Sequence, residues 1–259
     1  MLSARISLYI GGQVLKYLTL LFSILVLTSC AVNRPKGSTE AEVLFKEATR
    51  LKESERYIMA LEKLNTIKSQ YPYSYYATSA ELMQADILYL QENYEESAAA
   101  YLLFKDFHPK HPRMDYVTFK IAEAYYKQKP STFDRDLTAA KQAIKYFNEL
   151  RSLYPNSKYL KDAKDKIDEC YKMLKDKELY IANFYYKTED FQSAAFRYKN
   201  LLNRFNDDKV KKLASDRLVT IGLKSARPEL CELVFKNYRY LYKDGDLSNL
   251  KSDVKECLR

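Results

Sequence analysis

Two histidines, His108 and His111 in the string FHPKHP, are the first candidates for metal chemistry. Imidazole nitrogens ligate zinc, but a site needs further ligands, and a helical pair would be spaced four residues apart. The prolines beside both histidines instead predict a loop in which the rings contact the next helix. We therefore expect no metal and no cofactor.

Acidic side chains are plentiful, but none lies in an apolar stretch that would raise its pKa for acid–base catalysis. Asp134 and Asp136 flank Arg135, and we expect them to bond locally or to cap a helix. The sequence contains no nucleophile elbow and no Walker-type phosphate loop. These observations indicate that the protein is not an enzyme.

Cys30 follows an uncharged apolar run over residues 17–27, with Arg5 and Lys16 before it. That run is too short for a membrane-spanning helix of about 20 residues and suits the core of a signal peptide. The string LTSC ending at Cys30 resembles a bacterial lipobox, whose cysteine is cleaved free and acylated, for instance with palmitate. We expect a signal peptide at residues 1–29, and a lipidated Cys30 with a flexible tether over 30–40. An ordinary signal peptide with a chance cysteine is the alternative.

Three further cysteines follow, which is an odd number. Cys170 falls within a helical stretch and is predicted to be a small packing residue. Cys231 and Cys257 lie in the last helix pair and its tail. A disulfide between them and two free thiols are both compatible with the sequence.

The chain after residue 29 carries 41 Lys and Arg against 34 Asp and Glu, a net charge of +7. Such a charge can suit nucleic acid, but an exported lipoprotein meets anionic membrane surfaces and acidic proteins instead. We therefore expect no nucleic-acid partner.

Composition and internal repeats together predict the fold. The 259 residues include only 5 Gly and 7 Pro, which disfavours β-sandwiches and Gly-rich nucleotide-binding folds. Two segments share a pattern at a distance of 37 residues: small residues 12 apart, then large apolar residues, then proline. The matching positions are Ala48, Tyr57, Ala60, Leu64, Ile67 and Pro72, followed by Ala85, Tyr94, Ser97, Tyr101, Phe104 and Pro109. Small residues let two antiparallel helices approach, so each copy resembles a tetratricopeptide repeat.

Later copies carry insertions. The third has about nine extra residues between its helices, within residues 127–136, and the fourth has a long first helix without a breaker from residue 157 to 186. A degenerate fifth pair covers roughly residues 209–224 and 228–242. We predict an all-α protein, an α-solenoid of about five tetratricopeptide-like helix pairs.

Tyrosine is unusually common, with 24 residues. Most repeat tyrosines are predicted to be core. The string YPYSYY differs because it straddles the turn after the first repeat, where aromatic rings can line a groove that binds apolar side chains. Its members are Tyr71, Tyr73, Tyr75 and Tyr76.

Several strings in order, namely the lipobox, YPYS, HPRMDYV, DRD and YPNSKY, resemble the BamD (YfiO) family of lipoproteins over about residues 30–206. Members of that family are subunits of the BAM complex, which assembles and inserts β-barrel proteins into the outer membrane. The resemblance implies a scaffold that is lipid-anchored on the periplasmic face of the outer membrane. It implies three kinds of protein partner: a BamA-type barrel protein with POTRA domains, unfolded β-barrel substrates, and other Bam lipoproteins.

The resemblance also implies a division of labour. Repeats 1–3, residues 41–155, would receive the substrate signal, which ends in an aromatic residue and suits the tyrosine cluster. Repeats 4–5, residues 156–259, would dock the partner. Arg197 matches a family arginine that pairs with a BamA carboxylate, and its planar fork suits bidentate pairing; a solvated helix residue is the alternative.

Two other functions compete with this interpretation. A tetratricopeptide adaptor linked to peptidoglycan or cell division fits the same fold, although the coiled-coil segment common in such relatives is missing between Cys30 and the first repeat. A nutrient-binding lipoprotein is disfavoured because the chain has no Trp.

Overall fold

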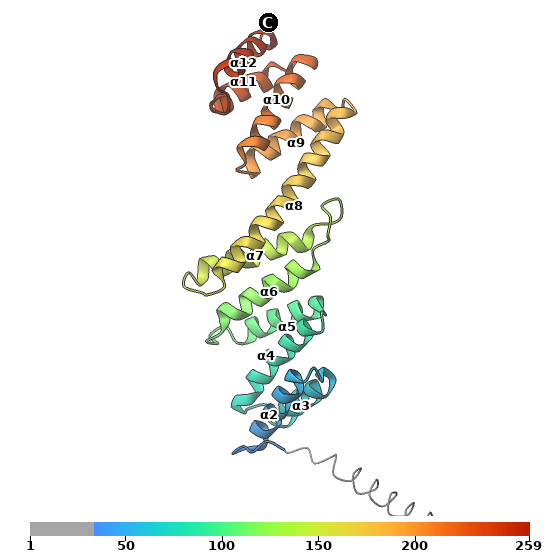
Figure 1. Cartoon of the computed structure of the whole chain (residues 1–259), viewed down its shortest axis with the longest axis vertical. Coiled ribbons are helices and arrows are strands. Elements are labelled where there is room, and N and C mark those ends of the chain that lie inside the picture. The colour runs from blue at the N-terminus through green and yellow to red at the C-terminus, as the bar shows by residue number, and fades with distance from the viewer. Residues whose placement is uncertain (1–33) are drawn as a thin grey trace, which may run out of the picture. The chain divides into compact units, whose positions relative to one another are not determined.

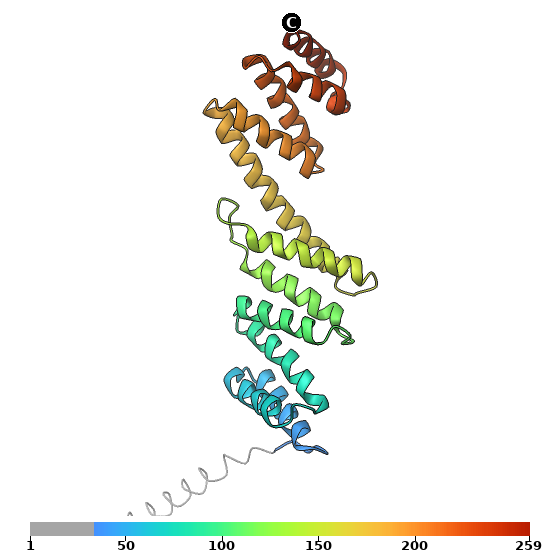
Figure 2. The same cartoon turned by 180° about the vertical axis from the view of Figure 1, so that it is seen from behind.

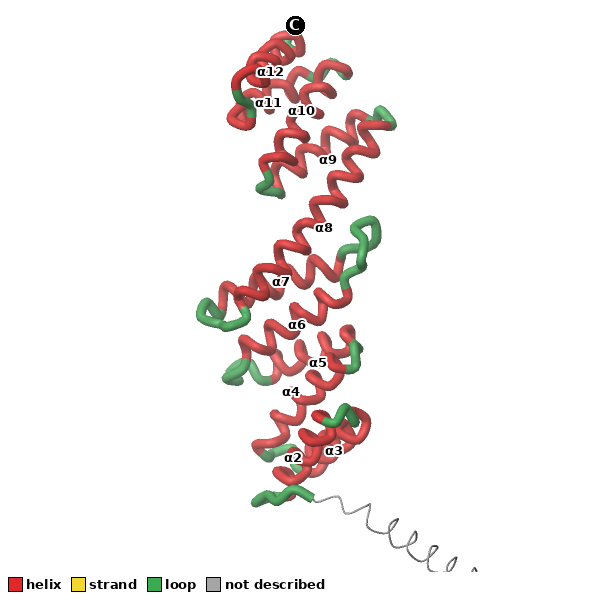
Figure 3. The backbone as a smooth tube through the Cα atoms, viewed as in Figure 1, coloured by secondary structure: helices red, strands yellow, loops and turns green. Residues whose placement is uncertain are grey.

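The computed structural model describes residues 34–259, so the predicted signal peptide and Cys30 lie outside the described residues. The described part forms two compact units, residues 34–83 and 84–259, and the division falls within one helix, α4 (Tyr75–Leu90). Throughout this part the regular elements are helices joined by short loops (Figure 3). The predicted functional boundary after residue 155 is a different one and stays a prediction.

The first unit holds α2 (Glu40–Glu53), α3 (Tyr57–Gln70) and the start of α4. Helix α2 begins after Thr39, whose hydroxyl accepts a hydrogen bond from the Glu42 amide at 3.2 Å and satisfies one end group of the helix. Ala48 and Ala60 are both fully buried, as expected for small residues at which two helices approach.

The second unit continues the helix pairs in chain order, and each helix from α5 onward packs against the next one (Figures 1 and 2). After the end of α4 the helices are α5 (Tyr94–Phe107), α6 (Met114–Gln128), α7 (Thr138–Leu153), α8 (Leu160–Lys187), α9 (Phe191–Arg204), α10 (Asp208–Lys224) and α11 (Pro228–Tyr238). The all-α class and the solenoid of helix pairs are confirmed.

Both predicted insertions are present. Helix α8 runs for 28 residues, and the insertion of the third copy forms the loop between α6 and α7. Asp136 bonds locally just before α7, because its carboxylate accepts from the Thr138 amide and hydroxyl at 3.0 Å each. The loop is held on α8 by Lys177, which donates to the Arg135 carbonyl at 2.5 Å.

The turns within four helix pairs share one backbone feature that the sequence does not predict. A residue two positions before the second helix has a left-handed conformation, with φ between 50° and 62°. These residues are Glu55, Glu92, Glu189 and Ala226. The conformation is strained for any residue with a Cβ, and glycine adopts it freely.

Glu92→Gly is therefore expected to raise the free energy of unfolding by about 0.5–1 kcal/mol, because the relief of strain exceeds the added freedom of the unfolded chain. Glu92→Ala is the matched control, since it removes the same carboxylate but keeps the Cβ. Thermal unfolding of the three chains measures the difference, and equal stabilities of the Gly and Ala variants would contradict the strain argument.

The C-terminal end differs from the prediction. Helix α11 ends at Tyr238, and a short 3₁₀ turn η1 (Arg239–Leu241) leads into a further helix, α12 (Asp244–Cys257), which packs on α10 and α11. The apolar pattern of α12 is too sparse to predict a helix from the sequence, because Leu250 and Val254 are its only buried residues. A disulfide joins Cys231 of α11 to Cys257 at the end of α12, which the sequence had left open.

Candidate functional site

The tyrosine cluster lies in the first unit, at the turn from α3 to α4. The Tyr71 amide donates to the Ile67 carbonyl at 2.8 Å and ends α3, and the Tyr71 carbonyl accepts from the Ser74 amide at 3.0 Å. The turn therefore holds its backbone tightly. Tyr71 is half-buried, whereas Tyr73 and Tyr75 are 101% and 83% exposed.

Tyr76 behaves differently from its neighbours. Its ring lies 5.4 Å from that of Phe45 on α2 and 5.5 Å from that of Tyr75, measured between centroids. Tyr76 thus fixes the start of α4, and its ring makes an edge-to-face contact with that of Tyr75. The two exposed rings offer apolar faces and free hydroxyl groups to a partner, and a substrate-binding role for the cluster stays a prediction.

Arg197 lies on α9 in the second unit and contacts a carboxylate of its own chain. Its Nη1 donates to Oε1 and Oε2 of Glu178 on α8, at 3.2 and 3.4 Å. The Glu178 side chain is 10% exposed and that of Arg197 is 33% exposed. Arg197 is therefore not a fully solvated residue, and part of its charge neutralises a nearly buried carboxylate.

The same geometry leaves room for a second carboxylate. A guanidinium carries five N–H donors, and Glu178 engages only those on Nη1. The Nε and Nη2 edge has the fork geometry that binds a carboxylate in a bidentate manner. The expectation missed Glu178, although a Glu between the buried Leu174 and Ala182, on the apolar face of α8, was a readable signal.

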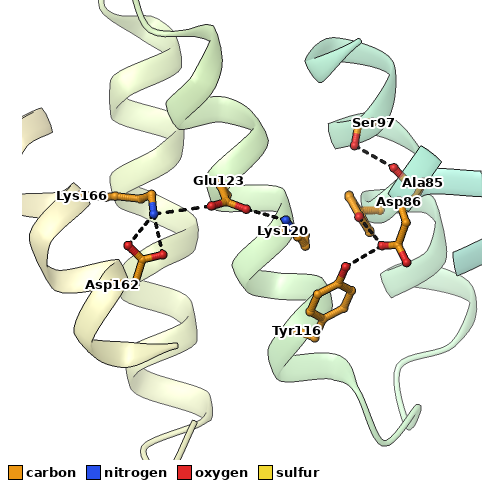
Figure 4. Close-up of polar contacts among 9 residues, drawn as sticks. Ala85, Asp86, Ser97, Tyr116, Lys120, Glu123, Asp162 and Lys166 are labelled. Atoms are coloured by element: carbon orange, nitrogen blue, oxygen red, sulfur yellow. Dashed lines mark hydrogen bonds and ion pairs between the residues drawn. The ribbon is translucent and has the colours of Figure 1, made fainter. Parts of the chain in front are cut away.

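A partly buried polar hub joins α4, α5 and α6 (Figure 4). Asp86 accepts hydrogen bonds from the Tyr101 hydroxyl at 2.5 Å and from the Tyr116 hydroxyl at 2.7 Å. Burial, followed by the charge of Asp86, raises the pKa of both tyrosines, so both hydroxyls stay protonated donors at neutral pH. Next to the hub, the Ser97 hydroxyl donates to the Ala85 carbonyl at 3.1 Å.

A chain of alternating charges continues from α6 to α8 (Figure 4). The Lys120 ammonium lies 2.7 Å from Glu123, Glu123 lies 3.5 Å from Lys166, and Lys166 lies 2.5 Å from Asp162. The Lys120 ammonium also sits 3.8 Å from the ring centroid of Tyr89 on α4. Because the charges balance and every member has a partner, this arrangement suits the fixing of helices rather than catalysis.

Sequence reasoning missed this network. One signal was present, because the 15-residue spacing of Asp86 and Tyr101 recurs at Asn183 and Tyr198, whose hydroxyl donates to the Asn183 side-chain oxygen at 2.8 Å. A polar residue after the small position of the first helix thus meets the tyrosine of the second helix in two separate repeats.

The two histidines lie in the loop between α5 and α6, as predicted, and His111 contacts the start of the next helix, because its Nδ1 accepts from the amide of Arg113, the residue before α6, at 3.3 Å. The rings of His108 and His111 lie 4.7 and 5.1 Å from that of Phe104 on α5. Within residues 34–259, no three His, Cys, Asp or Glu side chains are placed to hold a metal ion. In the same range, no helix combines the length and the apolar character needed to cross a membrane.

Comparison with known proteins gives a consistent set of matches. The model of one family, YfiO, described as an outer membrane lipoprotein, matches residues 38–222. Outer membrane protein assembly factor BamD of Neisseria gonorrhoeae is 28% identical over 64% of this chain, and the match spans 66% of that protein, just under two thirds. The BamD protein of Neisseria meningitidis serogroup A is 26% identical over 80% of this chain and 83% of its own length. The BamD protein of Rickettsia prowazekii is 28% identical over 70% of this chain and 72% of its own length.

A solved tetratricopeptide repeat protein from Parabacteroides merdae aligns over 83% of the chain and 85% of its own length, with 14% identity. Its TM-score of 0.37 is too low to carry an argument.

Proposed function

Because this chain belongs to the YfiO family of outer membrane lipoproteins, we propose that it is an outer membrane protein assembly factor, a non-enzymatic subunit of a BAM-type complex. It scaffolds the assembly and insertion of β-barrel proteins by holding a substrate and a membrane-embedded partner in a defined relation. An acylated Cys30 anchors it to the outer membrane, with the helical repeats on the periplasmic side.

One observation carries this proposal: the family match runs from residue 38 to 222 and so spans the helices from α2 to α10. The match includes both special features of the chain, the α6–α7 insertion and the 28-residue α8. The polar contacts described above, which the chain uses to fix neighbouring helices to one another, suit a rigid scaffold.

The substrate surface in this proposal is the tyrosine cluster. Tyr73 and Tyr75 present exposed rings on a turn whose backbone is fixed, and Tyr76 holds the start of α4 against Phe45. Aromatic rings held in this way bind apolar side chains at low entropic cost. The unfolded β-barrel substrate supplies the matching group, an aromatic residue at the end of its terminal strand.

The docking partner in this proposal is a BamA-type barrel protein with periplasmic POTRA domains. Arg197 contributes through its Nε and Nη2 edge, while Nη1 remains on Glu178. Other Bam lipoproteins join the same assembly.

Depletion of the chain tests the proposal. We expect the amounts of outer-membrane β-barrel proteins, measured by mass spectrometry of membranes, to fall together. A chain with Tyr73→Ser and Tyr75→Ser should restore them poorly, because the exposed rings that bind substrate are gone. The matched control is Tyr240→Ser in η1, which removes a ring that is 60% exposed at another place and should restore them fully.

Two results would contradict the proposal. Normal barrel proteins together with chains of undivided cells would favour the envelope adaptor. Full restoration by the double Tyr variant would remove the cluster from the substrate surface.

A further inference from the structure

The positive charge of this chain is concentrated in one segment. Residues 191–227 contain nine Lys and Arg against three Asp, a net charge of +6, while the chain after residue 29 has +7 in all. This segment comprises α9, α10 and the turns after them. A charge of this size raises the local concentration of anionic partners and speeds their association.

One face of α10 presents part of this charge around an open cleft. The cleft measures about 420 Å³. Its walls, which we name the α10 stripe, follow helical spacing along a single face: Lys209, Lys212, Leu213, Asp216, Arg217 and Thr220. The opposite face of α10 is buried, with Ala214, Leu218 and Val219 among its core residues.

The charged side chains of the α10 stripe differ in whether they already have a partner of opposite charge or a hydrogen bond within the chain. Asp216 accepts from the Tyr242 hydroxyl at 2.7 Å, and Lys212 lies 3.3 Å from Asp246 of α12. Lys209 and Arg217, in contrast, have no carboxylate within 4.0 Å among residues 34–259. The Arg217 guanidinium is instead placed by the ring of Tyr186 on α8, 4.4 Å from its centroid.

An apolar contact lies between the two available cations. Leu213 falls between Lys209 and Arg217, one helical turn from each, and is 38% exposed. The pattern of cation, aliphatic side chain and cation complements a segment in which acidic side chains flank an apolar one.

We propose that the α10 stripe is a docking site for an acidic segment of a partner protein, with carboxylates on Lys209 and Arg217 and an apolar side chain on Leu213. The inference rests on the geometry and charge of α10 and does not depend on the assembly role. It also differs from the Arg197 contact, which is made from α9 and shares its cation with Glu178.

The flanking acids favour a protein segment over an anionic lipid surface. Asp216 and Asp246 lie beside the cations, within 3.5 and 3.3 Å of Lys212. A membrane presents a continuous sheet of phosphates, which these carboxylates would repel. A peptide can place its acids selectively, so it can meet the cations and avoid the two aspartates.

The test measures binding of a fluorescent peptide of Glu, Asp and Leu to the full chain in neutral detergent, with anisotropy as the signal. We expect salt-sensitive binding, and we expect Lys209→Glu with Arg217→Gln to weaken it about tenfold, the loss that accompanies removal of two charge contacts. Lys209→Glu alone is the second variant: it is exposed and sits in the first turn of α10, where a carboxylate is tolerated, so folding is retained.

The matched control is Lys164→Glu with Lys172→Gln on α8, which makes the same change in charge at two side chains that are each 70% exposed. It should bind the peptide almost as well as the unchanged chain. Equal weakening by the control would show that net charge alone attracts the peptide, and would overturn the site.

Absence of peptide binding would overturn the proposal as well. A soluble short-chain phosphatidylglycerol serves as competitor, and displacement of the peptide by that lipid at lower concentration than by unlabelled peptide would assign the α10 stripe to lipid headgroups. A positive result would stand even if depletion of the chain left barrel proteins unchanged, so the two proposals fail separately.

Discussion

Replacing Arg197 by glutamate is expected to lower the free energy of unfolding of the α8–α9 pair by about 3 kcal/mol, because Glu178 would then face a second carboxylate. The Glu178 side chain is only 10% exposed, so water cannot replace the lost guanidinium. Arg197 is 33% exposed, which places the effect at the lower end for broken ion pairs. Hydrogen exchange of the α9 amides measures the loss.

The charge-swapped chain, Glu178→Arg with Arg197→Glu, is the matched control. It restores two opposite charges on α8 and α9, and we expect it to recover most of the lost protection. Unchanged exchange in the single variant would contradict the energetic role that we assign to this ion pair.

Co-purification of a POTRA-containing partner from membranes separates stability from binding. If the swapped chain is stable but does not recover the partner, Arg197 touches that partner directly. If the swapped chain recovers both the stability and the partner, Arg197 acts only by stabilising the α8–α9 pair, and its assignment to the partner surface is wrong. The single Arg197→Glu variant alone cannot make this distinction, since its loss of stability also disturbs the surface.

The helix pairs were predictable because each pair leaves a short-range record in the sequence. Ala182 and Ala194 stand 12 residues apart, are both fully buried, and mark where α8 meets α9, as Ala48 and Ala60 do for α2 and α3. The length of α8 was readable for a related reason, since no glycine or proline interrupts residues 160–187. Such local rules concern spacing along the chain, which the sequence displays directly.

The contacts that bear on function depend on residues far apart in the chain. Asp86 accepts hydrogen bonds from hydroxyls that lie 15 and 30 residues away, on two other helices. These three residues are too far apart in the sequence to be recognised as one short motif. Arg197 was predicted as a candidate, but its ion pair to Glu178 depends on the rotation of α8 about its axis. Helix α12 was missed because a disulfide, rather than a wide apolar face, secures it.

Reduction of the Cys231–Cys257 disulfide is expected to destabilise the docking of α12 by about 3 kcal/mol, the loop-closure contribution for residues 26 apart. Because Leu250 and Val254 are the only buried residues of α12, its contacts without the disulfide are weak, and we expect its amides to lose most of their protection from hydrogen exchange. Alkylation with and without reductant checks that Cys231 and Cys257 are joined before reduction and are free thiols after it. Burial raises the pKa of the Cys170 thiol to about 11, so Cys170 stays protonated and should not react in either state while the chain is folded.

Gly222 provides an internal check on the same contact. A Cβ at this position would lie 2.6 Å from Cys231 Sγ and 3.0 Å from Cys257 Sγ, so Gly222→Ala forces the disulfide or its helices to shift. We expect Gly222→Ala to cost about 1–3 kcal/mol in the oxidised chain and clearly less after reduction, because both sulfur atoms are then free to rotate away from the added Cβ. An equal cost in both states would place the strain elsewhere, for instance against the Arg227 carbonyl at 3.1 Å.

Protection of the α12 amides that is unchanged by reductant would contradict the role of the disulfide, and α12 would then be held by its own packing.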